Sequence, residues 1–207
     1  MMDIPTSSSC LSAWHSYKLA AESAGDKRIV SLDGQGADEL LAGYLHYLIY
    51  YLYPMNPVEA AKQCIKYLNH DGAGKIITKA FLLKMLKMTQ NKPSLIRNLL
   101  KLPTNISSVN EICLHDIVGN LKLLYYYGDK ESIAFSVESR LPYIDYRLID
   151  FVLSIPSIYK FHEGWPKYLS RKSFEDKLPG EVVWRKTKHG WSIPDKFWFD
   201  SAYKHKV

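Results

Sequence analysis

The hydrophobic pattern at the start of the chain predicts a helix, a strand, a glycine turn and another helix, in that order. Residues 11–24 carry apolar side chains at helical spacing, after a run of serines and before Gly25, which can end a helix. Residues 28–32 form a short β-rich run, residues 33–39 a turn, and residues 40–53 are again helix-like. This order is typical of a parallel α/β sheet, in which ligands bind beyond the carboxyl ends of the strands.

From residue 56 onward the pattern is helical. Asn56, Pro57 and Glu59 have the order of a helix cap, a first helical residue and a third-position glutamate. Further helices are predicted over residues 75–88, 109–127, 146–153 and 167–177, and Asp145 resembles a cap for the third of these. No second clear strand appears, and one parallel strand cannot satisfy its own hydrogen bonds. Further strands are therefore expected upstream of this sequence.

Composition indicates one globular domain over residues 1–207. With 207 residues, of which 47% are hydrophobic, the chain can bury a sizeable core. No apolar stretch reaches the roughly twenty residues that a membrane span needs, and the first ten residues lack the features of a secretory signal. A cytoplasmic location is the default expectation. The cysteines, Cys10, Cys64 and Cys113, form no CxxC pair and are expected to be buried thiols.

The net charge of +6 favours an anionic partner without choosing among nucleic acid, a membrane surface and a small substrate. The basic residues are spread along the chain and form no unbroken basic run, so nucleic acid is disfavoured. Nucleotide phosphates are the better expectation, and no membrane partner is predicted.

The turn after the predicted strand has the residues of a nucleotide site. Gly34 and Gly36 let a ligand approach the backbone, and Asp38 with Glu39 offers oxygen ligands for Mg²⁺. The alternative from the same residues is a strand-to-helix turn whose acidic pair complements the helix dipole.

Three blocks of sequence resemble the synthetase domain of glutamine-hydrolysing asparagine synthetases and related adenylating ligases. The first is GQGADELLAGY at residues 34–44, and the second is SIAFSVESRLPYID at residues 132–145. The third runs through WPKYLSR at 165–171, LP at 178–179 and WRKTKHGW at 184–191, followed by Pro194. The resemblance implies a partial parallel sheet of the ATP-pyrophosphatase (adenine-nucleotide α-hydrolase) type, followed by a mostly helical C-terminal region.

The reaction that this resemblance implies belongs to asparagine biosynthesis. The β-carboxylate of aspartate attacks the α-phosphorus of Mg-ATP, giving β-aspartyl-AMP and pyrophosphate, and ammonia then displaces AMP. By resemblance Asp38 is a magnesium ligand and Lys188 is a catalytic lysine over the phosphates. Gln35 lies near the acyl intermediate in a position where relatives carry Glu or Tyr; since Gln cannot act as a general base, the base is unassigned. The nucleotide is bordered by Leu32, Asp33, Gly34 and Gly36.

Several charged residues in the matching blocks are predicted to be anchors for phosphate or for the structure, Glu39 among them. Glu138 and Arg140 lie two residues apart and cannot face each other on a helix, so they are interpreted as separate anchors, each a structural ion-pair partner in preference to a catalytic group. Lys167 and Arg171, at i and i+4, share a helix face and can meet either phosphate or an acidic neighbour.

Two parts of the family pattern do not occur in this sequence. These are the phosphate-cradling SGGxDS motif and the glutaminase domain with cysteine at its second position, where this chain has Met2. The sequence is therefore expected to be part of a synthetase domain and inactive alone, with ammonia coming from a glutaminase domain not present here. A homodimer or a complementing chain is left open. The alternatives are a ligase that adenylates another carboxylate, closing a lactam or modifying a peptide, and a non-catalytic nucleotide-binding remnant.

Overall fold

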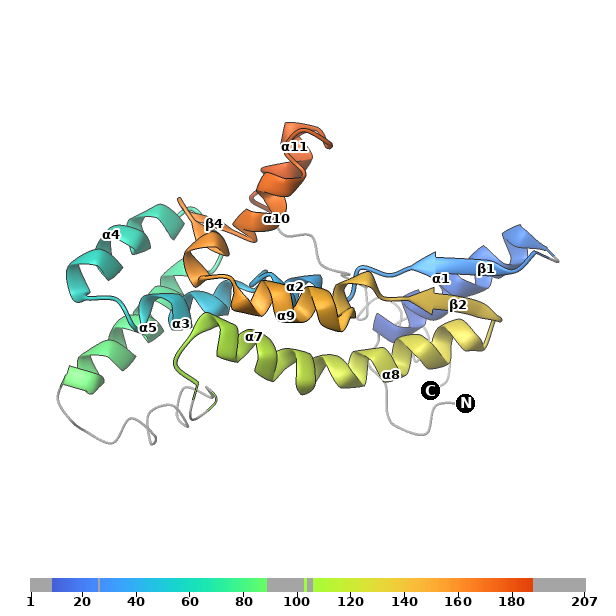
Figure 1. The fold of residues 1–207 in the computed structure, drawn as a ribbon, viewed down its shortest axis with the longest axis horizontal. Helices are drawn as coiled ribbons and strands as arrows, with labels where there is room; N and C mark the ends of the chain where they lie inside the picture. The colour runs from blue at the N-terminus through green and yellow to red at the C-terminus, as the bar shows by residue number, and fades with distance from the viewer. Residues whose placement is uncertain (1–8, 26, 89–102, 104–105, 188–207) are drawn as a thin grey trace, which may run out of the picture. The chain divides into compact units, whose positions relative to one another are not determined.

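The computed structural model describes residues 9–25, 27–88, 103 and 106–187 of the chain (Figure 1). The chain divides into two compact units. Unit 1 comprises residues 1–33, 122–142 and 188–207, and unit 2 comprises residues 34–121 and 143–187. Helices dominate and accompany a small parallel sheet, so the predicted α/β class with a mostly helical C-terminal region is confirmed.

Unit 1 is built around a two-stranded parallel sheet. Strand β1 (Ile29–Leu32) pairs with β2 (Val137–Arg140), with Ile29 opposite Val137 and Leu32 opposite Arg140. Helix α1 (Ser9–Ala24) packs along β1, and the Trp14 ring meets the edge of Phe135 at 4.7 Å. Helix α8 (Asn120–Ile133) begins at the end of unit 2 and continues through unit 1 to β2.

Strand β2 corrects the expectation that the sequence holds a single strand. Its residues, Val-Glu-Ser-Arg, include one apolar side chain, and Val137 alone of the four is buried. Hydrophobic alternation cannot identify so short a strand, because the signal comes from several alternating apolar residues. Its partner β1 lies far away in the sequence, so the pairing had no local signal either.

Unit 2 contains the remaining elements of the described chain. The α-helices are α2 (Ala37–Leu40), α3 (Leu48–Leu52), α4 (Pro57–Tyr67), α5 (Ala73–Met88), α7 (Val109–Val118), α9 (Tyr146–Ser154), α10 (Tyr168–Ser173) and α11 (Gly180–Val183). Short 3₁₀ turns are η1 (Leu45–Tyr47), η2 (Pro142–Ile144) at the boundary of the units, and η3 (Ser157–Tyr159). A small antiparallel hairpin joins β3 (Phe161–His162) to β4 (Trp165–Pro166).

Side-chain caps fix the start of two helices as the sequence predicts. The Asn56 side chain accepts a hydrogen bond from the Glu59 N–H at 2.9 Å, with Pro57 at the first helical position of α4. The Asp145 side chain accepts from the Arg147 N–H at 2.9 Å and begins α9. Each cap satisfies a backbone donor that has no partner within its own helix.

Three of the predicted helices are shorter or broken in the structure. The helix predicted over residues 40–53 is interrupted after Leu40, where Ala42 takes a left-handed conformation (φ 57°). The helix predicted over 109–127 breaks at Gly119, and the one predicted over 167–177 is reduced to α10. Apolar residues continue on both sides of each interruption, so the hydrophobic pattern hides the breaks.

The core of unit 2 is aromatic and aliphatic, with a few buried polar groups. Tyr51 stacks on Phe161 at 5.1 Å, and the Tyr67 ring meets the edge of Phe161 at 5.9 Å. The three cysteines are buried as predicted, Cys64 and Cys113 in this core. Burial raises the pKa of the Cys113 thiol to about 11.

A fully buried lysine lies in the same unit. The Lys160 ammonium donates to Asn110 Oδ1 at 2.6 Å and has no exposed surface. Asn110 in turn donates to the carbonyls of Leu153 at 2.7 Å and Ile155 at 3.1 Å, so it ties α7 to the end of α9.

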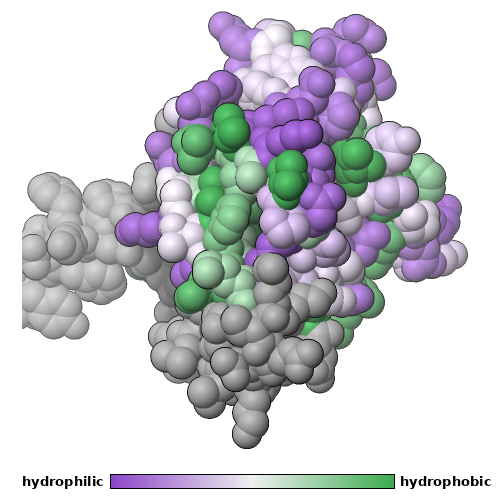
Figure 2. Space-filling view, turned by 90° about the vertical axis from the view of Figure 1, so that its left-hand side faces the viewer, coloured by the Kyte–Doolittle hydropathy of each residue, from purple (hydrophilic) through white to green (hydrophobic). Residues whose placement is uncertain are grey.

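The surface of the helices at the left of Figure 1 is mixed in character. Figure 2 shows that face, with apolar residues gathered in a band beside hydrophilic ones. Exposed apolar residues on α4 and α5 are Val58, Ile65, Phe81, Leu82 and Met85. Within the described ranges, no helix combines the length and the apolar character that crossing a membrane requires.

Candidate functional site

The glycine turn follows directly from β1. The Asp33 N–H donates to the Arg140 carbonyl at 2.8 Å, so the pairing of the two strands extends one residue beyond Leu32. Unit 2 then begins at Gly34. Gly36 has φ 90°, a conformation that glycine adopts without strain, and its carbonyl accepts from the Leu40 N–H at 2.9 Å.

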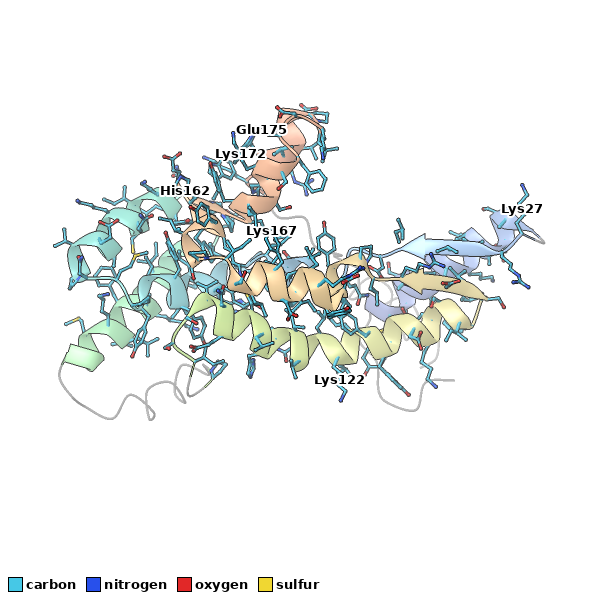
Figure 3. The ribbon with its side chains drawn as sticks, in the orientation of Figure 1. Lys27, Lys122, His162, Lys167, Lys172 and Glu175 are labelled. Carbon is cyan, nitrogen blue, oxygen red and sulfur yellow. The ribbon has the colours of Figure 1, made fainter. Side chains whose placement is uncertain are left out.

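Asp38, in the first turn of α2, forms an ion pair with Lys167. The distance from Lys167 Nζ to Asp38 Oδ1 is 2.6 Å, and the two side chains are 30% and 28% exposed. Lys167 lies between β4 and α10 in a left-handed conformation (φ 55°). Figure 3 shows it at the start of α10, with Lys172 and Glu175 toward the other end. The fold therefore brings together two charged residues that are distant in the sequence.

Gly43 makes room for this ion pair. A Cβ atom at residue 43 would lie 1.9 Å from Asp38 Oδ1 and 2.1 Å from Lys167 Cε, far inside contact distance. The Gly43 N–H also donates to the Asp38 carbonyl at 2.7 Å, closing the turn after α2. Sequence reasoning assigned no role to Gly43. The sequence did contain a signal: Gly43 follows the candidate ligand Asp38 closely and falls inside the helix predicted over residues 40–53, where glycine is unfavourable.

Glu39 points into unit 2 rather than sharing the site with Asp38. It is buried and accepts a hydrogen bond from the Tyr44 hydroxyl at 2.7 Å. Burial, together with this hydrogen bond, raises the pKa of Tyr44 well above its ordinary value. The described residues hold no group of three His, Cys, Asp or Glu side chains that could bind a metal. One partly exposed carboxylate, that of Asp38, does fit Mg²⁺ that arrives with a nucleotide, since such sites use one or two carboxylates plus phosphates and water.

A buried polar cluster supports the site from α7. The Tyr47 hydroxyl donates to Asp116 Oδ2, and Asn120 Nδ2 donates to Asp116 Oδ1 at 2.9 Å. Burial, and then the bond to Asp116, raises the pKa of Tyr47 far above its ordinary value. Helices α2 and α7 are in contact, and this cluster joins α7 to η1, which follows α2 in the chain.

Comparisons with known proteins give the family. The model of the family described as asparagine synthase matches residues 1–207. The chain belongs to the asparagine synthase family. Asparagine synthetase [glutamine-hydrolyzing] 3 of Bacillus subtilis is 26% identical over 160 residues, which are 76% of this chain and 25% of that protein. Asparagine synthetase [glutamine-hydrolyzing] of Gallus gallus is 36% identical over 89 residues, 38% of this chain and 16% of that protein.

The chain thus spans a quarter or less of the length of these relatives of the asparagine synthase family. No solved structure matches it significantly. The resemblance seen in the three sequence blocks is confirmed by the family match, whereas the roles of single residues remain predictions.

The structure corrects the interpretation of Glu138 and Arg140 as separate anchors in this family block. Arg140 Nε donates to Glu138 Oε1 at 2.8 Å, and the two side chains are 61% and 60% exposed. They lie on strand β2 instead of a helix, and residues two apart on a strand point to the same face. The two form an exposed local ion pair within unit 1.

Arg171 contacts its own unit. Its Nε donates to the Pro166 carbonyl at 3.0 Å, its Nη1 donates to the Val183 carbonyl, and its guanidinium lies 5.1 Å from the centre of the Trp165 ring. Burial, assisted by the neighbouring Arg185, lowers its pKa. Arg171 therefore joins β4, α10 and α11, and of the predicted i, i+4 pair it is Lys167 that meets an acidic neighbour.

The remaining predicted residues are distributed over both units. Leu32 ends β1 and Asp33 follows it, both in unit 1, and Gln35 is half-buried in unit 2, two residues before the start of α2. Lys188 lies outside the described residues, as do His189, Trp191 and Pro194 of the third family block.

Proposed function

We propose that this chain supplies part of the nucleotide-activating site of an ATP-dependent amide ligase. In the proposed reaction the β-carboxylate of aspartate is adenylated, and ammonia then displaces AMP to give asparagine. The observation that carries the proposal is the family match over residues 1–207, combined with a partly exposed carboxylate, Asp38, in the first turn of the helix that follows the glycine turn.

The proposed roles follow the chemistry of each side chain. Asp38 would hold Mg²⁺, which when bound supplies positive charge to the phosphates of ATP. The main chain of residues 32–34 and 36 would border the nucleotide. Lys188 would place a compact positive charge over the phosphates.

Gln35 would contact the acyl group but cannot remove a proton. Its amide can donate and accept hydrogen bonds, so it can orient the activated carboxyl group, whereas deprotonation of the attacking ammonia needs another group. Ammonia would come from a glutaminase domain, as the names of the relatives imply for those proteins.

A chimera tests the proposal. This chain would replace the residues of the Bacillus subtilis asparagine synthetase 3 to which it aligns, and AMP, pyrophosphate and asparagine would be measured with Mg-ATP, aspartate and ammonium. Asparagine formation that disappears in a matched chimera with Asp38→Asn supports the proposal. The same assay with other carboxylates in place of aspartate tests the related lactam- or peptide-forming ligases.

Two results of the chimera assay would contradict the proposal. A folded chimera that releases no AMP with any carboxylate, while the parent synthetase is active under the same conditions, would favour a non-catalytic remnant. An active chimera whose activity survives Asp38→Asn would remove Asp38 from the nucleotide site.

A further inference from the structure

The ion pair of Asp38 with Lys167 changes what the candidate cation site can bind. The ammonium is 2.6 Å from Asp38 Oδ1, so the accessible carboxylate is already compensated by a positive charge. The neighbouring carboxylate, Glu39, is buried and holds the Tyr44 hydroxyl. A hard divalent cation takes oxygen ligands, and the carboxylates among them supply the negative charge that compensates it. The carboxylate side of the site therefore offers little net negative charge to a cation that arrives alone.

The pair is built into the backbone around it. Gly43 leaves space for both partners at once, since a Cβ there would overlap Asp38 Oδ1 and Lys167 Cε. The backbone of Lys167 is in the left-handed conformation, which residues other than glycine adopt at some cost in free energy. Three separate features of unit 2, at Asp38, Gly43 and Lys167, thus converge on one contact.

We propose that Lys167 is an internal counter-ion that prevents Asp38 from binding a free divalent cation, so that the cation enters with the nucleotide. The inference deepens the proposed function and rests on it in taking Asp38 to face the nucleotide. The polyphosphate supplies the negative charge that the paired carboxylate lacks, and its oxygens also attract the Lys167 ammonium. Lys167 acts on the cation through the charge of Asp38, with which it is paired.

Binding of Mn²⁺ without nucleotide tests this inference directly. Free Mn²⁺ would be measured by electron paramagnetic resonance during titration of the full 207-residue chain and its variants. Lys167→Gln is expected to raise the affinity about tenfold, because it removes a unit charge close to a divalent ion at a partly exposed site. Lys167→Arg keeps the charge and is expected to bind Mn²⁺ as weakly as the unaltered chain.

Two further variants separate this local effect from a change in net charge. Lys172 lies on α10, is more than half exposed and pairs with Glu175, so Lys172→Gln removes the same charge away from Asp38 and should leave the affinity unchanged. Asp38→Asn added to Lys167→Gln should abolish the gain. A gain that occurs equally in Lys172→Gln, or that survives Asp38→Asn, would overturn the inference.

Gly43→Ala provides a test that changes no charge. The added methyl group meets two flexible side-chain ends, so the chain can fold with Asp38 and Lys167 pushed apart. We expect a smaller gain in Mn²⁺ affinity than in Lys167→Gln. Unchanged affinity in both variants, with circular dichroism like that of the unaltered chain, would contradict the inference. That result would not decide the proposed function, which the chimera tests separately. The chimera is assayed at saturating Mg-ATP, so its activity does not depend on how tightly the chain binds a free cation.

Discussion

The two units each carry a carboxylate–cation pair in a family block, and the two pairs are built differently. In unit 2 the Asp38–Lys167 pair joins the start of α2 to the start of α10, with both side chains about two-thirds buried. In unit 1 the Glu138–Arg140 pair joins neighbours on one face of β2, and both side chains are mostly exposed. The first pair requires the tertiary fold, whereas the second requires only an extended strand.

This difference extends to other polar contacts of the two units. Unit 2 buries hydrogen bonds between distant segments, such as Tyr47 with Asp116 and Lys160 with Asn110. In unit 1 the Tyr17 hydroxyl meets Ser139 Oγ at 3.4 Å, a longer and half-buried contact. Unit 1 has a buried contact of this kind at Glu131, which is hydrogen-bonded to Cys10, beside the packing around its two strands. Single polar side chains should therefore contribute to the stability of both units, and more of them are found in unit 2 among the contacts named here.

The largest effect is expected from Asn110→Ala. This change leaves the buried Lys160 ammonium without its amide partner and removes the donor to two carbonyls at the end of α9. We expect unit 2 to lose about 3 kcal/mol of unfolding free energy, the usual cost of leaving a buried charge without its partner. Urea unfolding of the unaltered chain and the variant measures this loss of free energy.

Lys160→Met is the matched control for that prediction. It removes the buried charge itself while Asn110 keeps both carbonyl contacts, so a loss of about 1 kcal/mol is expected. Equal losses in the two variants would show that packing at residue 160, and not the polar contact, holds α7 to α9.

The second largest effect is expected in unit 1, from Val137→Ala. Val137 is buried opposite Ile29, and truncation removes two methyl groups from the sheet, at about 2 kcal/mol. Amide hydrogen exchange should rise in β1 and β2 and stay low in α3 of unit 2. Val30→Ala, at a residue that is half exposed in the same sheet, should change stability by less than about 0.5 kcal/mol. Faster exchange in both units together would contradict the comparison.

The two ion pairs themselves should differ by a smaller amount. Double-mutant cycles on Asp38 with Lys167 should give a coupling of about 1 kcal/mol, since the pair is partly screened from water. The same cycles on Glu138 with Arg140 should give less than about 0.5 kcal/mol, as exposed pairs do. Equal coupling energies, or a stronger coupling in unit 1, would mean that the difference in burial does not determine the strength of the two ion pairs.

These contrasts also explain which features the sequence could predict. The caps at Asn56 and Asp145 were predicted correctly because capping depends on residues within one turn. The glycine turn after β1 was found for the same reason, since two glycines and an acidic residue stand together. Family resemblance then placed Asp38 at a candidate cation site, a role that is still a prediction.

The features that sequence reasoning missed depend on distant segments. Strand β2 has one buried side chain of its own and is a strand because β1 lies beside it. The partner of Lys167 was left open between phosphate and an acid, since helical spacing carries no information about α2. Gly43 could be given no role from the sequence, because its role depends on the contact between Asp38 and Lys167 in the space that a Cβ at residue 43 would fill.

The smallest effect concerns the Asp145 cap, the contact in unit 2 that most resembles the local pair of unit 1. Hydrogen bonds from the Arg147 side chain and N–H lower the Asp145 pKa from 3.8 to about 2. A lowered pKa means that the folded protein favours the carboxylate, so this contribution is complete above pH 4 and is lost as the pH falls toward 2. Carboxyl-carbon NMR should give this pKa directly.

In Arg147→Gln the pKa of Asp145 should rise while staying below 3.8, because the backbone N–H still donates to the carboxylate. A pKa of 3.8 in the unaltered chain would show that the cap is not formed in solution.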